Sequence, residues 1–125
     1  MNDKRPVNLD IGSMRLPITA YVSILHRISG VVLLALAGVA LWMLDVSLSS
    51  EAGFEALEEI LSGIWFKLLL WALLAALAYH LAAGIRHLLM DMGVGESLRG
   101  GVLGARLVLV VTAVLVILTG VWLWG

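Results

Sequence analysis

The stretch LVLVVTAVLVILTGVWLW runs from Leu107 to Trp124 without a single charged side chain. A helix that crosses a bilayer needs roughly 20 mostly apolar residues at about 1.5 Å each, and this stretch is close to that length. Because water does not reach the hydrocarbon, only helices and closed barrels satisfy their backbone there. An uninterrupted apolar run of this kind predicts a membrane-spanning helix.

Two similar segments precede it, at about 20–44 with the run VVLLALAGVALWML, and at about 64–90. Hydrophobic residues make up 62% of the 125 residues and mean hydropathy is +1.05, which is too apolar for a soluble domain of this size. We therefore expect an all-α membrane protein. It forms a single domain over residues 1–125, with three transmembrane helices and a polar arm at residues 1–19.

Loop charge predicts the orientation. Residues 45–63, DVSLSSEAGFEALEEILSG, carry five acidic side chains and no basic one. The positive-inside rule then places the N-terminus and the second loop in the cytoplasm, and the C-terminus in the periplasm. The basic residues on the cytoplasmic side are Lys4, Arg5, Arg15, Arg86, Arg99 and Arg106. Four tryptophans form an outer interfacial belt in this topology: Trp42, Trp65, Trp122 and Trp124.

The acidic connection itself predicts a short amphipathic helix in the first external loop. Ser50 is a suitable N-cap, and Phe54, Leu57 and Leu61 share one face of the helix that follows. Such a helix lies in the membrane interface.

Composition excludes several kinds of site. The chain has no cysteine, which removes thiolate metal sites, disulfides and iron–sulfur ligation. The net charge of −1 shows no basic footprint for nucleic acid. Three histidines remain as candidates for metal or haem ligation.

The first candidate site lies on the first span, in SILHRISG. Ser23, His26, Arg27 and Gly30 follow one another at spacings of three and four, so they share one helix face. Arg27 snorkelling to headgroups beside an interfacial His26 would also explain the pattern. A site for a polar or anionic ligand explains better why serine, histidine and arginine converge on one stripe.

The second candidate is His80, which is flanked on its face by Ala76, Ala83, Gly84 and His87. Small neighbours leave room for a flat ligand or for a close helix. The uses of a histidine at this depth are haem ligation, proton relay and hydrogen-bonded packing. His80 and His87 are about 10.5 Å apart along the axis and cannot grip one iron from opposite faces. The opposite ligand then comes from His26 or from another subunit.

Three stretches together resemble a known family: RPVNLDI (5–11), LPITAYVSILHRISGV (16–31) and AYHLAAGIRHLLMDMG (78–93). In this order and spacing they are similar to the signature stretches of the cytochrome b membrane-anchor subunit of succinate dehydrogenase, the respiratory complex II, in its bacterial form. The resemblance implies a multi-pass subunit of the bacterial cytoplasmic (inner) membrane. It has no catalytic activity alone and serves the tricarboxylic acid cycle.

Members of that family work in a heterotetramer. A flavoprotein subunit oxidises succinate, an iron–sulfur subunit carries the electrons, and two membrane-anchor subunits hold one haem b and reduce ubiquinone. The resemblance implies that His80 is the axial ligand of the haem iron, with the opposite ligand from the second anchor. It also implies that His26 and Arg27 lie beside the haem propionates and that Ser23 and Arg27 line the quinone site. If His80 binds the haem iron, we expect the small Gly84 and the alanines to make room for the macrocycle.

Three other functions stay open at this point. An anchor of a quinol:fumarate reductase runs the reaction in reverse. A haem-free structural anchor or assembly partner would use His80 for packing. A small transporter subunit is the weakest alternative, because no broken helix or inverted repeat is visible in the sequence.

Overall fold

The computed structural model describes residue 7 and residues 9–125, and every regular element in that part of the chain is helical. Lys4 and three of the seven residues of the RPVNLDI stretch, Arg5, Pro6 and Asn8, lie outside the described residues. A short 3-10 helix, η1 (Ile11–Ser13), is followed by α1 (Ile18–Ser49), α2 (Glu51–Ser62), α3 (Ile64–Asp91) and α4 (Leu98–Trp124).

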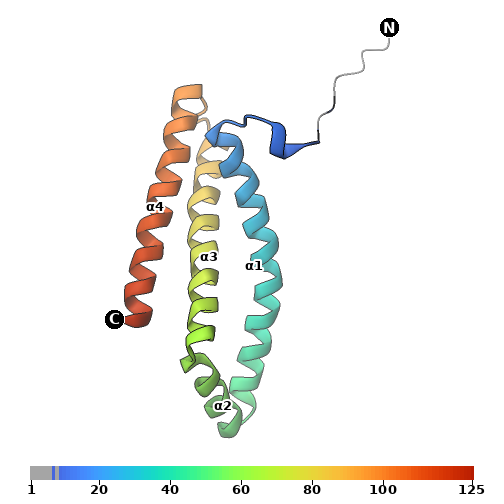
Figure 1. Cartoon of the computed structure of the whole chain (residues 1–125), viewed down its shortest axis with the longest axis vertical. Helices are drawn as coiled ribbons and strands as arrows, with labels where there is room; N and C mark the ends of the chain where they lie inside the picture. The colour runs from blue at the N-terminus through green and yellow to red at the C-terminus, as the bar shows by residue number, and fades with distance from the viewer. Residues whose placement is uncertain (1–6, 8) are drawn as a thin grey trace.

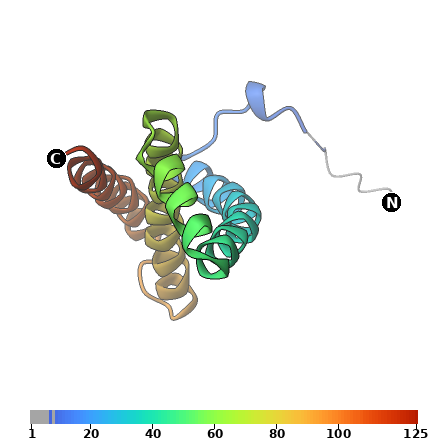
Figure 2. The same ribbon diagram turned by 90° about the horizontal axis from the view of Figure 1, so that it is seen from below.

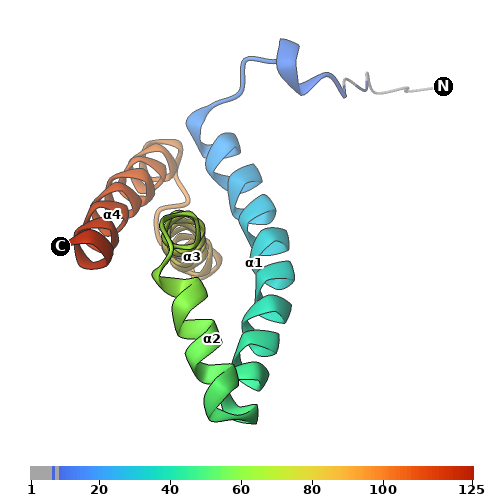
Figure 3. The same ribbon diagram turned by 60° about the horizontal axis from the view of Figure 1, so that its bottom comes forward.

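The helix α3 lies between α1 and α4, and consecutive long helices run in opposite directions (Figures 1 and 3). Residues 9–17 and the α3–α4 loop lie at one end, which we call the arm end, and α2 lies at the opposite end (Figure 1). The view from below shows α3 between α1 and α4 (Figure 2). The turn between α3 and α4 uses Gly93 (φ 85°) and Gly95 (φ 73°), a backbone region that favours glycine.

Burial in this chain is concentrated at the arm end. Val22, Ala83, Ala105 and Val108 form the buried apolar cluster, with one or two residues from each long helix. Elsewhere large apolar side chains face outward; Leu34 is 77% exposed and Trp65 82% exposed. Since the helices α1, α3 and α4 are all long and apolar enough to cross a membrane, lipid rather than water is the solvent for these faces.

The helices extend beyond the predicted apolar segments. The helix α4 begins at Leu98 rather than near 107, because the Ser97 hydroxyl caps it by accepting from the Gly100 N–H (3.0 Å). Similarly, α1 begins at Ile18, after Pro17, and continues to Ser49. The predicted bounds marked where side chains are apolar, whereas helical hydrogen bonding continues through the polar residues at the ends.

The connection between α1 and α3 is itself the helix α2. The Ser50 hydroxyl accepts from the Gly53 N–H (2.9 Å), which is the N-cap arrangement.

At the same end of the molecule, the Trp71 indole N–H of α3 donates to the Val116 carbonyl of α4 (2.9 Å). This bond ties α3 to α4 far from the buried cluster.

Candidate functional site

All three histidines meet between α1 and α3. The His26 ring stacks on the His80 ring with centroids 4.3 Å apart and an interplanar angle of 15°. The His26 ring also contacts the His87 ring, with centroids 4.9 Å apart and an interplanar angle of 38°. One histidine from α1 thus contacts two histidines that lie two turns apart on α3.

Hydrogen bonds fix the state of the His80 ring. The buried Ser29 hydroxyl donates its one proton to the His26 carbonyl at 2.7 Å. It therefore accepts from Nδ1–H of His80 at 2.9 Å, and the His26 carbonyl lies 3.2 Å from the same Nδ1. With its proton on Nδ1, His80 keeps the lone pair of Nε2, the atom a metal would take.

Two glycines permit the close approach of these rings. A Cβ at Gly30 would lie 3.1 Å from Cε1 of His80, and a Cβ at Gly84 would lie 3.3 Å from Nε2 of His26. In the structure, Gly84 therefore makes room for the His26 imidazole. A role of Gly84 in accommodating a macrocycle stays a prediction.

Next to the histidines, Tyr79 fastens α3 to α1. Its hydroxyl donates to the Val22 carbonyl at 2.6 Å, and its ring packs against the buried cluster. The register of α3 against α1 is thereby fixed one residue away from His80.

The two predicted quinone residues lie one helical turn apart on α1, but their surroundings differ. Ser23 is half-buried, whereas Arg27 is exposed and takes no part in the contact between the histidine rings. Adjacent residues therefore serve different faces: His26 turns to α3, and Arg27 turns outward.

The histidine rings are not arranged to hold one iron between them. The rings of His26 and His80 lie face to face, so their nitrogens do not point at one iron from opposite sides. Among the described residues there is also no group of three side chains suited to hold a metal ion. Within the site, His80 has an oriented ring and an available Nε2, which makes it the candidate metal ligand of this chain.

Sequence reasoning missed Ser29 and the contact of His87 with His26. A signal for Ser29 was present, because it lies three residues after His26 and can bond back to that carbonyl. The contact of Ser29 with His80 depends on how α1 packs against α3, and the spacing of residues within one helix does not predict that packing.

Three long spans and a histidine cluster at one end define a multi-pass membrane protein with a candidate ligand site. The family model for the succinate dehydrogenase/fumarate reductase transmembrane subunit matches residues 1–119. The chain is 43% identical to the succinate dehydrogenase cytochrome b556 subunit of Coxiella burnetii over 125 residues, covering 99% of this chain and 100% of the relative. It is 30% identical to the subunit of the same name from Paracoccus denitrificans over 115 residues, covering 92% and 88%.

A third relative, the succinate dehydrogenase cytochrome b560 subunit of Reclinomonas americana, is 39% identical over 98 residues, covering 74% of this chain and 68% of the relative. The chain belongs to the succinate dehydrogenase/fumarate reductase transmembrane subunit family, as a cytochrome b membrane anchor of succinate dehydrogenase. It is a multi-pass protein of the bacterial inner membrane.

Proposed function

We propose that this anchor holds one b-type haem together with a second anchor subunit, and that His80 is its axial ligand. The hydrogen bond from Nδ1–H of His80 to Ser29 (2.9 Å) is the observation that carries the proposal, because it leaves Nε2 available for iron. The naming of the relatives as cytochrome b subunits supports the same conclusion. A bound haem would supply a reversible one-electron store between the iron–sulfur subunit and the quinone.

The chain's own residues have separate tasks in this proposal. Ser29 and the His26 carbonyl orient the His80 ring and hold its proton at Nδ1. The fixed charge of Arg27 and the ring of His26 are suited to the haem carboxylates, as charge-assisted hydrogen-bond donors.

The proposal also includes a quinone-reduction site with Ser23 and Arg27. The hydroxyl of Ser23 can donate to a quinone carbonyl, and the Arg27 guanidinium stabilises the negative charge that develops on the oxygen. The exposed position of Arg27 supports this role, because its guanidinium can reach a ligand outside the chain. A second anchor and the iron–sulfur subunit would complete the pocket, and succinate would be the electron source.

The haem half is tested by reduced-minus-oxidised spectra of the complex purified through this subunit. We expect a b-type spectrum from the wild type, loss or alteration of that spectrum in His80→Leu, and retention in His87→Leu. Flavin content measured in the same samples shows whether the complex is assembled. An assembled wild-type complex without haem would overturn the proposal in favour of a structural anchor.

The quinone half is tested separately with Arg27→Leu. We expect slow reduction of a soluble ubiquinone analogue with succinate, while succinate oxidation by an artificial dye survives. Arg106→Leu is the control, because it removes another exposed arginine, which lies on α4. Normal quinone turnover in Arg27→Leu would remove this residue from the site.

A further inference from the structure

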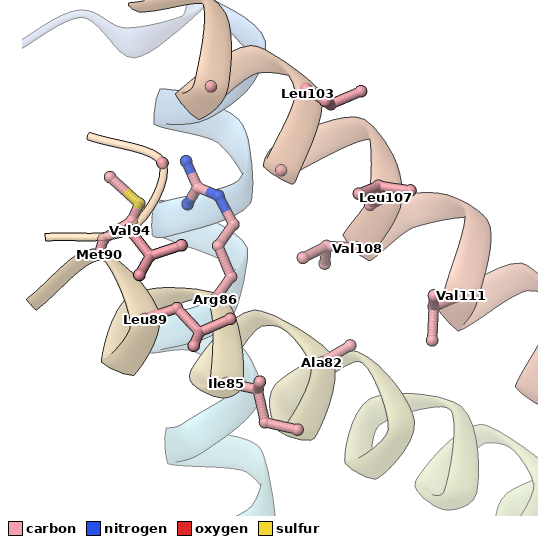
Figure 4. Close-up of a pocket in the computed structure, with 13 residues that line it drawn as sticks. Ala82, Ile85, Arg86, Leu89, Met90, Val94, Leu103, Leu107, Val108 and Val111 are labelled. Carbon is pink, nitrogen blue, oxygen red and sulfur yellow. The ribbon is translucent and has the colours of Figure 1, made fainter. Parts of the chain in front are cut away.

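A groove between α3 and α4 lies apart from the histidine cluster. Its volume is about 430 Å³, and it is lined by residues of α3, the α3–α4 loop and the arm-end half of α4 (Figure 4). The walls are apolar apart from Arg86 and the backbone, and no acidic side chain lines it. The floor and rim include Ala82 and Ile85 from α3, and Leu103, Leu107 and Val111 from α4.

Arg86 brings an unbalanced positive charge to this groove. Its side chain is only 8% exposed, and Nη2 donates to the Gly101 carbonyl at 3.3 Å. Its Nε–H is buried and has no hydrogen-bond partner. No carboxylate among residues 7 and 9–125 forms an ion pair with it. An arginine cannot shed its charge, so burial without a counter-ion is costly and points to an anion supplied from outside.

Glycines bring the guanidinium against the wall of α4. A Cβ at Gly104 would lie 3.3 Å from Nε of Arg86, and Gly100 is a further lining residue. Because Gly101 belongs to the first turn of α4, the guanidinium lies near the helix end, where lipid headgroups begin. Arg99, which is exposed, lies beside Gly100 at the same level.

The groove is elongated along α4. From Gly100 to Val111 the α4 wall extends about 16 Å along its axis. The apolar segment of α4 begins at Leu107, so the groove begins outside the hydrocarbon, beside Arg86, and extends about one turn into it.

We propose that this groove binds one anionic phospholipid, whose phosphodiester lies at Arg86 and whose acyl chain follows the α4 wall. The charge favours an anionic headgroup over a zwitterionic one, because the groove offers no carboxylate to a headgroup ammonium. The bound lipid supplies the counter-ion that Arg86 lacks among the described residues, and it fills space between α3 and α4.

The test is native mass spectrometry of the intact, delipidated complex, titrated with phosphatidylglycerol or phosphatidylethanolamine. We expect the wild type to bind one phosphatidylglycerol more tightly than phosphatidylethanolamine. Arg86→Gln should weaken that binding by at least about fivefold, the contribution of one basic residue near a lipid phosphate. Arg106→Gln, an exposed α4 arginine outside the groove, should match the wild type.

Leu107→Trp keeps Arg86 and obstructs the apolar part of the groove, so it tests the acyl-chain contact if Arg86→Gln does not assemble. It should also lower phosphatidylglycerol binding. Inorganic phosphate at millimolar concentration should not compete; full competition would mean a free-anion site and would overturn the proposal. Equal wild-type affinity for the two lipids would overturn it too, as would a groove found covered by another subunit.

Discussion

Replacing Ser29 by alanine removes the hydroxyl that bridges α1 and α3. The change takes away the bond to Nδ1 of His80 (2.9 Å) and the bond back to the His26 carbonyl (2.7 Å). The His26 carbonyl, at 3.2 Å, remains as the weaker acceptor for Nδ1–H. We therefore expect His80 to keep its tautomer and its iron, but with a weaker hydrogen bond that makes the imidazole a poorer electron donor.

The magnitude follows from the value of one hydrogen bond. A net contribution of about 0.5–1.5 kcal/mol corresponds to about 20–65 mV for a one-electron couple, since 59 mV is a tenfold change. A poorer electron donor stabilises oxidised iron less, and reduced iron is affected less than oxidised iron. The haem midpoint potential should therefore rise in Ser29→Ala. The assay is a spectroscopic redox titration of the purified complex.

Ser47→Ala is the matched control for this prediction. Ser47 makes the same type of bond back to a carbonyl three residues earlier on α1, Leu44 at 2.8 Å, but contacts no histidine. The haem midpoint potential of the Ser47→Ala complex should equal that of the wild type. An unchanged potential in Ser29→Ala, with haem fully retained, would refute the reasoning that Ser29 controls His80.

Two further predictions concern packing. In Gly84→Val, the Cβ alone would lie 3.3 Å from Nε2 of His26, so the stacked rings should separate and the haem content per flavin should fall. In the control Gly38→Val, the Cβ would meet nothing within 4 Å, and the haem content per flavin should equal that of the wild type. Trp71→Phe removes the indole bond to the Val116 carbonyl (2.9 Å) and should lower the stability of the complex by about 0.6 kcal/mol, the typical value of such a bond in a membrane protein. Thermal unfolding in detergent measures it, and a loss of several kcal/mol would show that Trp71 does more than donate this bond.

The helical fold was predictable because each span is set by local properties. An apolar run long enough to cross lipid has one structural solution, and the three runs of this chain sufficed to predict α1, α3 and α4. The ends were less predictable. The start of α4 depends on the Ser97 cap, and the charges of Arg99 and Arg106 obscured the helix that contains them.

Only those features of the candidate site that lie within a single helix could be predicted from the sequence. The spacing of His26 and Gly30, or of His80 and Gly84, places them on one face without any tertiary information. Which faces meet is set by packing, and here the Tyr79 hydroxyl bond to Val22 fixes that register. Ser29 therefore became visible as a partner of His80 only after α1 and α3 were placed side by side.

The same packing explains why one chain would supply only half of the proposed haem site. To hold the iron from both sides, two histidines must face each other across a gap as wide as the macrocycle. Gly30 and Gly84 instead bring α1 and α3 so close that His26 stacks directly on His80. Close packing within the chain orients the His80 ring through Ser29, and it also prevents His26 from serving as the opposite ligand. In the proposed site, the second ligand therefore has to come from a second anchor subunit.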